Sequence, residues 1–243
     1  MRSSGNPVFR KLNKMEYGAE NYNVATYTGV GLKILYFIII AIISAFVGIY
    51  FAIKSPEVFV FFLIGSLVLG FISALVAMIK PKLALPFGTV YSICEGVLLG
   101  VISAIAEEIV PGVVMTTIFV TLSIVLVCAV LFLTGLIKVS NGFYRFLMIF
   151  AIGFMLAMLM MFVVTLFGIL TEISWPIYIL VGVLSCLLAT LFLISDMNQA
   201  YQLVSNGGPK EYEWMVAFGI SYTVLWIYLE ILRIMVIIFG NRK

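Results

Sequence analysis

Seven long apolar segments, separated by short polar loops, dominate this sequence of 243 residues. Hydrophobic residues make up 64% of the chain and charged residues only 10%, which lies outside the range of soluble proteins. A helix needs about 20 apolar residues, at a rise of roughly 1.5 Å each, to cross the hydrocarbon core of a bilayer. We therefore predict an all-α protein with seven transmembrane helices, at residues 33–53, 58–79, 83–106, 113–137, 146–170, 175–195 and 214–239.

The lengths of the loops leave no room for a soluble domain. We predict a cytoplasmic N-terminal tail at residues 1–29, followed by a seven-helix transmembrane domain at residues 30–243. The first apolar segment is long and is not followed by a small-residue cleavage site, so we interpret it as a mature transmembrane helix and not as a signal peptide. The lipid bilayer is the partner that this composition implies. Nucleic acid is not an expected partner, because the basic residues lie where they would orient the helices.

The basic residues are unevenly divided between the two sides of the membrane. In a seven-helix topology, the N-terminal tail shares its side with the loops after the second, fourth and sixth helices. That side holds Arg2, Arg10, Lys11, Lys14, Lys33, Lys80, Lys82, Lys138, Arg145 and Lys210, whereas the other side holds Lys54, Arg242 and Lys243. Because cytoplasmic loops are enriched in Lys and Arg, this bias predicts a cytoplasmic N-terminus and an external C-terminus. The basic residues at the C-terminal end argue against an external C-terminus. The alternative is a six-span topology with a re-entrant last segment, which would return this end to the cytoplasmic side.

The absence of histidine narrows the chemistry that this chain can perform. It excludes Ser-His hydrolysis and His-ligated zinc or haem, and no phosphate-binding or dinucleotide motif occurs. The cysteines, Cys94, Cys128 and Cys186, all lie inside apolar segments, where they are interpreted as small packing residues and predict no disulfide. We expect neither enzymatic activity, nor a cofactor, nor a tightly bound metal ion.

Four ionisable residues remain within the apolar segments or at their ends, where a charge is costly and often functional. Glu95 lies in the middle of the third predicted helix, Asp196 ends the sixth, and Glu230 and Arg233 lie in the seventh. Glu230 and Arg233 are three residues apart and share a helix face, so one interpretation is a self-neutralising ion pair. By position alone, Asp196 is either an ordinary interfacial residue or part of an aqueous entrance. Glu95 either lines the same cavity or forms a hydrogen bond within the bundle while protonated.

Asp196 and Glu230 are the strongest candidates for a functional site. If the last two helices extend beyond the membrane around a turn at residues 206–209, the two carboxylates reach matching depths. Two buried carboxylates in contact cannot both ionise cheaply, so we expect them to share a proton and titrate as a coupled unit. Oxygen ligands suit Ca²⁺ or H⁺, but two carboxylates are too few for a tight calcium site. A carboxylate pair that titrates as a unit and binds cations only weakly favours a gate in a permeation pathway.

Lys80 and Lys82 end the second predicted helix on the same side of the membrane as Asp196. One interpretation is that they only anchor the topology. The sharper hypothesis makes Lys80 and Lys82 partners that latch Asp196. Small residues such as Gly96 and Gly100 suit close packing between helices.

Two motifs resemble signatures of the Bax inhibitor 1 family, the transmembrane Bax inhibitor motif proteins. Residues 195–199, Ser-Asp-Met-Asn-Gln, are similar to the family's sixth-helix pattern of an Asp followed shortly by Asn-Gln. Residues 228–230, Tyr-Leu-Glu, resemble its seventh-helix pattern Tyr-Leu-Asp, with Glu in place of the usual Asp. The N-terminal Ser-Gly-Asn-Pro-Val-Phe and the pair Glu95-Gly96 resemble a prokaryotic branch.

The resemblance implies a bundle whose seventh helix is central and surrounded by the other six. It also implies a pH-sensitive calcium leak that is gated by Asp196 and Glu230, with Lys80 helping to hold the closed state. A bacterial plasma membrane is the expected location. Because some bacterial members are linked to modulation of a membrane protease, a non-transporting protein that binds another membrane protein is the second hypothesis. A proton-coupled exchanger is the third.

Overall fold

The computed structural model describes residues 24–54, 56–134, 136, 139–167 and 175–240. Most of the predicted N-terminal tail, together with Lys138, Arg242 and Lys243, lies outside the described residues. Within the described part, seven α-helices and one short 3-10 helix account for nearly the whole chain, and no strand is present. The helices are α2 (Tyr27–Lys54), α3 (Pro56–Ile79), η1 (Pro81–Leu83), α4 (Ala84–Ile109), α5 (Val113–Leu133), α6 (Asn141–Leu166), α7 (Trp175–Ser205) and α8 (Tyr212–Gly240).

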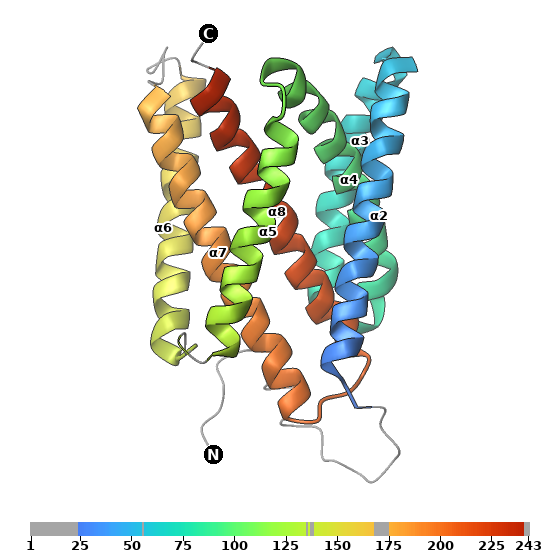
Figure 1. Ribbon diagram of the computed structural model, residues 1–243, viewed down its shortest axis with the longest axis vertical. Coiled ribbons are helices and arrows are strands. Elements are labelled where there is room, and N and C mark those ends of the chain that lie inside the picture. The colour runs from blue at the N-terminus through green and yellow to red at the C-terminus, as the bar shows by residue number, and fades with distance from the viewer. Residues whose placement is uncertain (1–23, 55, 135, 137–138, 168–174, 241–243) are drawn as a thin grey trace.

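Each helix matches one of the seven apolar segments, because in lipid a helix satisfies its backbone hydrogen bonds within the segment itself. Six of the helices are long and apolar enough to cross a bilayer, and the apolar stretch Leu63–Ile79 within α3 is shorter. The bundle in Figure 1 is therefore a polytopic membrane fold, as predicted. α8 is one continuous helix of 29 residues. It ends at the pole of the bundle opposite to the start of α2, so the re-entrant alternative is not the observed arrangement (Figure 1).

The connection between α7 and α8 matches the predicted turn. α7 continues nine residues past Asp196, and Gly207 then adopts a left-handed φ of 63°, a conformation that glycine tolerates. The same turn anchors the start of the bundle, since the backbone N–H of Ala25 donates to the carbonyl of Gly208 at 2.9 Å. The first described residues of the chain are thereby tied to the α7–α8 turn.

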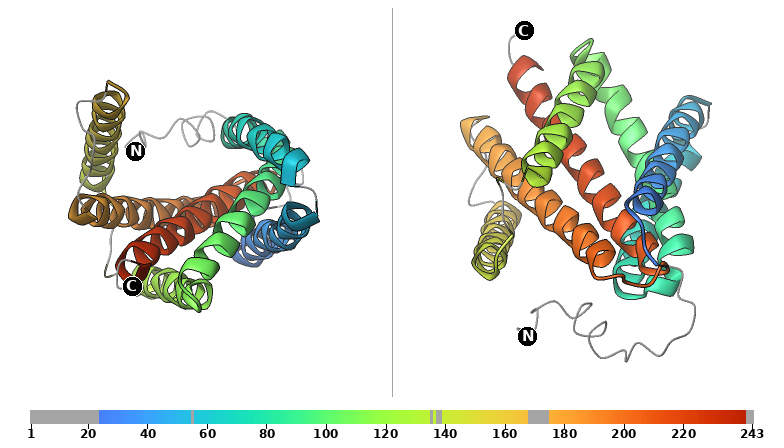
Figure 2. Two further views of the ribbon diagram at one scale, coloured as in Figure 1. Left: turned by 90° about the horizontal axis from the view of Figure 1, so that it is seen from above. Right: turned by 60° about the horizontal axis from the view of Figure 1, so that its bottom comes forward.

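α8 occupies the centre of the molecule. It packs against α2, α3, α4, α5 and α7, and its buried residues extend from Tyr212 to Leu232 (Figure 2). This confirms the expected central position of the last helix. The expectation that all six other helices surround it needs a correction, because among the described residues α6 packs against α7 alone. The only side chain of α6 that is fully buried is that of Leu147.

The tightest helix contact joins α4 to α2. A Cβ atom added at Gly96 would collide with the backbone carbonyl of Ala41, and one added at Gly100 would collide with that of Ala45. The two backbones therefore touch along one face, which confirms the small-residue packing predicted for Gly96 and Gly100. This contact holds α4, the helix that carries Glu95, against α2.

Candidate functional site

Asp196 lies on α7 beside a cavity of about 580 Å³. Its side chain is half-buried. One carboxylate oxygen, Oδ2, accepts a hydrogen bond from the Thr223 hydroxyl of α8 at 2.6 Å, and Oδ1 accepts a longer one of 3.4 Å from the Gln199 amide. No Lys or Arg in the described part of the chain forms an ion pair with Asp196. The carboxylate thus faces the cavity with hydroxyl and amide partners but without a compensating cation.

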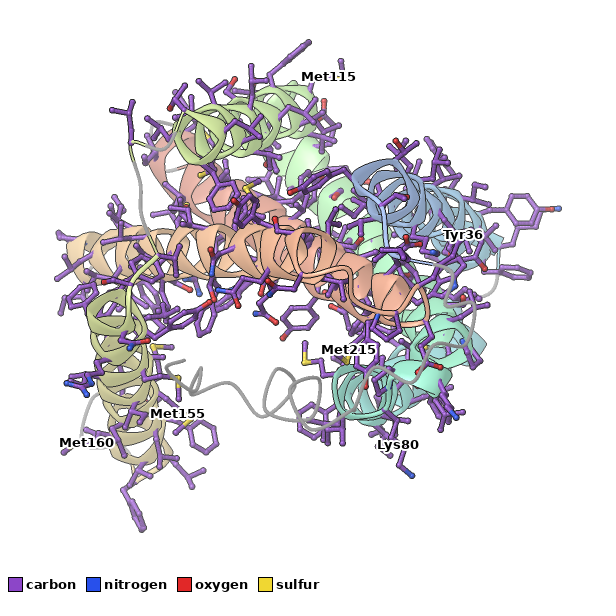
Figure 3. The ribbon with its side chains drawn as sticks, turned by 90° about the horizontal axis from the view of Figure 1, so that it is seen from below. Tyr36, Lys80, Met115, Met155, Met160 and Met215 are labelled. Atoms are coloured by element: carbon purple, nitrogen blue, oxygen red, sulfur yellow. The ribbon has the colours of Figure 1, made fainter. Side chains whose placement is uncertain are left out.

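The cavity exists because α6 stands apart from α8. Its walls come from four helices: Met78 of α3, Tyr144 of α6, Asp196 of α7 and Met215 of α8 are representative. Figure 3 shows α6 and the end of α3 on the same face of the α7–α8 hairpin, far apart from each other, with Met215 in the space between them. The amide of Asn198 donates to the Tyr144 hydroxyl at 3.1 Å and so ties α6 to α7 at the edge of the cavity.

Most of the cavity lining is apolar. Its polar groups gather beside Asp196, where Ser195, Gln199, Tyr222 and Thr223 contribute hydroxyl or amide groups. These are oxygen and amide groups of the kind that hard cations and water bind. The local sequence suggested an aqueous entrance at this point, and the polar part of the lining is confined to the surroundings of Asp196.

Glu230 lies elsewhere on α8, where it lines an apolar cavity of about 330 Å³ together with Arg233. Its side chain is buried, and Oε1 accepts hydrogen bonds from the Ser185 hydroxyl at 2.7 Å and from the Trp226 indole N–H at 3.2 Å. Oε2 forms an ion pair with Arg233 at 2.5 Å. Of the interpretations open for Arg233, the self-neutralising pair with Glu230 is the one that the structure shows. Glu230 is therefore held by three partners and has its charge compensated.

The structure does not bring Asp196 and Glu230 together. Asp196 is opposite Thr223, and Glu230 follows Thr223 by seven residues, which places the two carboxylates about 10 Å apart along the axis of α8. On α7, Glu230 is opposite Ser185, which precedes Asp196 by eleven residues. The expected carboxylate pair at hydrogen-bonding distance is therefore wrong for this conformation. The helices do extend around the turn as predicted, but the register between them offsets the two side chains by two turns.

Lys80 does not act as a latch in this structure. It is exposed at the N-cap of η1, and its side chain points away from the bundle (Figure 3). The described residues contain no ion pair between Lys80 and Asp196. The residue of the α3 end that reaches the Asp196 cavity is Met78, two positions earlier. The hypothesis that Lys80 anchors the topology is compatible with this exposed position.

Glu95 lines a second cavity, of about 270 Å³, between α3, α4 and α8. Its side chain is half-buried, and Ser66, Gly70 and Tyr91 contribute to the same lining. The alternative that Glu95 lines the same cavity as Asp196 needs a correction, because Glu95 lines a separate cavity.

Sequence reasoning missed a buried ion pair between Lys33 of α2 and Glu213 of α8. The Glu213 carboxylate is inaccessible to solvent, accepts a hydrogen bond from the backbone N–H of Thr26 at 2.7 Å, and pairs with Lys33. The ammonium group of Lys33 also lies 5.0 Å from the centroid of the Trp214 ring. The sequence did contain an indication of this ion pair, because both charged residues lie at helix ends on the same predicted side of the membrane. Lys33 had been counted only as a determinant of topology.

Thr223 was also missed. A single threonine in an apolar helix is common, and nothing in its local sequence indicates that its hydroxyl reaches Asp196. Tyr222, Thr223 and Trp226 are close together on α8, and each carries a polar group. Only the packing of α7 on α8 shows that Thr223 is the one that contacts the carboxylate of Asp196.

Comparison with known proteins agrees with the motifs in the last two helices. The sequence model of a family described as Bax inhibitor 1 like matches residues 6–240, which is nearly the whole chain. A search of curated proteins found no match.

Proposed function

Because the chain belongs to the Bax inhibitor 1 family, we propose that it forms a pH-sensitive leak pathway for cations, with Ca²⁺ as the ion, across the membrane that it spans. The observation that carries the proposal is the half-buried carboxylate of Asp196, which faces a cavity of about 580 Å³ without a basic partner among the described residues. An ionisable group at membrane depth is costly, and such groups characteristically mark ion pathways.

The chemistry around Asp196 suits a weakly held hard cation. Ca²⁺ prefers six to eight oxygen ligands. Asp196, the side-chain carbonyl of Gln199 and the hydroxyls of Tyr222 and Thr223 supply only part of that set. Water completes the shell, so the ion binds loosely enough to leave again, as permeation requires. Protonation of Asp196 removes its negative charge and with it the attraction for the cation, which makes the pathway sensitive to pH.

Glu230 and Arg233 form the closed part of the proposed pathway. Their ion pair neutralises the carboxylate, and the bonds from Ser185 and Trp226 hold it in place. An ion that enters at Asp196 therefore meets no available charge on Glu230 in this conformation. We propose that separation of Glu230 from Arg233 accompanies opening, so that Glu230 remains a gating residue without forming a pair with Asp196.

The proposal also includes the orientation and location expected from the basic residues. The N-terminus and the Asp196 cavity would lie toward the cytoplasm of a bacterial plasma membrane, and the protein would be neither an enzyme nor dependent on a cofactor. Fusion of a periplasm-sensitive or cytoplasm-sensitive reporter to each terminus tests this orientation. Reporter activity that places the start of α2 outside the cell contradicts it.

Calcium flux into proteoliposomes, measured across a pH series, tests the function. Wild-type protein is expected to carry Ca²⁺ with a rate that depends on pH. Asp196→Asn should remove most of the flux together with its pH dependence, and Glu230→Gln should alter the gating. Glu108→Gln is a matched control, because Glu108 is exposed and lines none of the cavities of Asp196, Glu95 and Glu230. Flux that is absent, or that is independent of pH and unchanged in Asp196→Asn, refutes the proposal.

One observation favours the second candidate function, a non-transporting protein that binds a membrane partner. α6 contacts only α7 within the described part, and nearly all of its apolar surface is open. A partner helix, such as that of a membrane protease, has room to pack there. Site-specific cross-linking from Met155 and Met160, both exposed on α6, tests this function in native membranes (Figure 3). Recovery of the same adduct from wild type and from Asp196→Asn supports a binding function that is independent of the carboxylate.

A further inference from the structure

The cavities of Asp196 and Glu95 share a wall. Tyr222 and Trp226, both on α8, line the larger cavity that contains Asp196 and also the smaller one that contains Glu95. The two residues are four positions apart, so their side chains lie one above the other on a single face of the helix. Two aromatic side chains therefore separate two half-buried carboxylates that belong to different helices.

The other contacts of the wall hold it in position. The Tyr222 ring packs against the Tyr91 ring of α4, with a centroid distance of 5.4 Å. Trp226 donates its indole N–H to Glu230 at 3.2 Å, and its ring lies 6.1 Å from the centroid of Phe192 on α7. Each ring is thus fixed on one side by a neighbour, while its remaining surface borders the cavities. The bond from Trp226 also connects the wall to the ion pair between Glu230 and Arg233.

Glu95 lies at the depth that Glu230 was expected to occupy. The hydrogen bond of 2.7 Å between Ser103 and Tyr228 sets the register of α4 on α8, and the Tyr91–Phe218 ring contact shows that the two helices run in the same direction. Glu95 precedes Ser103 by eight residues, or about 12 Å along the helix axis. Thr223, the partner of Asp196, precedes Tyr228 by five residues, or about 7.5 Å. The two carboxylates therefore lie within about one helical turn of each other in depth.

We infer that Glu95 is a second cation-binding carboxylate of the pathway, which an ion reaches from Asp196 by passing the side chains of Tyr222 and Trp226. The inference rests on the proposed cation leak and identifies the next site along it. Conduction requires successive sites that bind weakly enough to release the ion, and one carboxylate in each neighbouring cavity provides such a pair. The aromatic faces between them attract a cation electrostatically while they block free diffusion. The pair of acidic residues at matching depth is then Asp196 and Glu95, and Glu230 acts on the wall through Trp226.

Flux measurements on purified protein in proteoliposomes test the second site. At the pH of maximal wild-type flux, Glu95→Gln should reduce Ca²⁺ entry by roughly tenfold, as expected when a weak site loses its charged ligand. Glu108→Gln, on the same helix but outside both cavities, should leave the flux unchanged. Tyr222→Ala should raise the flux, because it removes half of the aromatic wall.

A second measurement does not depend on flux. In a chain that carries alanine at positions 94, 128 and 186, Ser66→Cys places a thiol in the lining of the Glu95 cavity, and Gln199→Cys places one in the Asp196 cavity. Both thiols should react with a trimethylammonium thiosulfonate reagent, and Ca²⁺ should slow both reactions. Ile64→Cys, on the exposed apolar face of α3, should remain unreactive in lipid.

The possible outcomes separate the inference from the function on which it rests. Wild-type flux that Asp196→Asn abolishes and Glu95→Gln leaves intact overturns the inference alone. A Ser66→Cys thiol that stays inert while Gln199→Cys reacts also overturns it, because the cation then does not enter the second cavity. Wild-type protein without any flux overturns the proposed function and, because it rests on that function, the inference of a second site. Reduced flux in Glu95→Gln together with a reactive, Ca²⁺-protected Ser66→Cys supports the inference.

Discussion

The hydroxyl of Thr223 donates a hydrogen bond of 2.6 Å to the carboxylate of Asp196 across the interface between α7 and α8. This bond joins residues 27 positions apart and is the shortest contact of the carboxylate. It fixes the direction of Asp196 toward the cavity, so Thr223 acts as a positioning residue for the proposed ion site.

Replacement of Thr223 by Val should weaken the α7–α8 interface. The change keeps the shape of the side chain but removes the hydrogen bond to the carboxyl group of Asp196, and a hydrogen bond of this kind contributes about 0.5–1.5 kcal/mol. Because water in the cavity can replace part of the bond, we expect a loss of about 1 kcal/mol in the free energy of unfolding. Thermal or denaturant unfolding in detergent measures this loss. Thr223→Ser should retain most of the stability, and the effect of Thr223→Val should shrink in an Asp196→Asn background.

Removal of Arg233 should cost more than removal of the charge on Glu230. The side chain of Glu230 is 9% exposed and that of Arg233 is 42% exposed. Arg233→Met leaves a buried carboxylate without compensation, at a cost of about 3 kcal/mol, whereas Glu230→Gln leaves an Arg that can reach a polar interface. Unfolding in detergent at neutral pH should rank Arg233→Met as the less stable variant, and the double variant should recover part of the loss. Equal losses in the two single variants contradict this assignment.

The ion pair between Lys33 and Glu213 should contribute strongly to the attachment of α2 to α8. Glu213 is fully buried, so Lys33→Met leaves its charge uncompensated, and we expect a loss of about 3–5 kcal/mol. Lys33→Arg should restore much of this stability, because it keeps the positive charge. Hydrogen exchange at the start of α2 should increase in Lys33→Met, since Glu213 also accepts the backbone N–H of Thr26. Unchanged exchange there shows that the start of α2 is held by other contacts.

Gly96→Ala and Gly100→Ala should separate α2 from α4. The added methyl groups meet the backbone carbonyls of Ala41 and Ala45, and backbone cannot move aside as a flexible side chain can. Overpacking of this kind costs about 1–3 kcal/mol. Gly65→Ala is a control, because the space beside Gly65 is open and alanine favours a helix over glycine by up to about 1 kcal/mol. A thermal shift assay should show a lower melting temperature for the first two variants and an equal or higher one for the control.

Structural features that depend only on residues close together in the sequence could be predicted from the sequence alone. Apolar runs of about 20 residues dictate transmembrane helices because lipid offers the backbone no other hydrogen-bond partner. The ion pair between Glu230 and Arg233 follows from a spacing of three residues on one helix. The turn at Gly207 follows from its tolerance of positive φ. Family membership was also accessible from the sequence, since the two motifs lie within continuous segments.

The contacts between helices were decided only by the tertiary structure. The spacing of residues tells which side chains share a face of one helix, but not how far one helix slides along its neighbour. That register comes from packing between helices, such as the contact of Gly182 on α7 with Ile234 on α8, and it offsets Glu230 from Asp196 by two turns. The packing of α4 on α8 in turn brings Glu95 to a depth similar to that of Asp196. The pairing of Lys33 with Glu213, 180 residues away, has the same origin. The sequence therefore determined which ionisable groups lie within the membrane, and the packing of the helices around α8 decided which of them share a site.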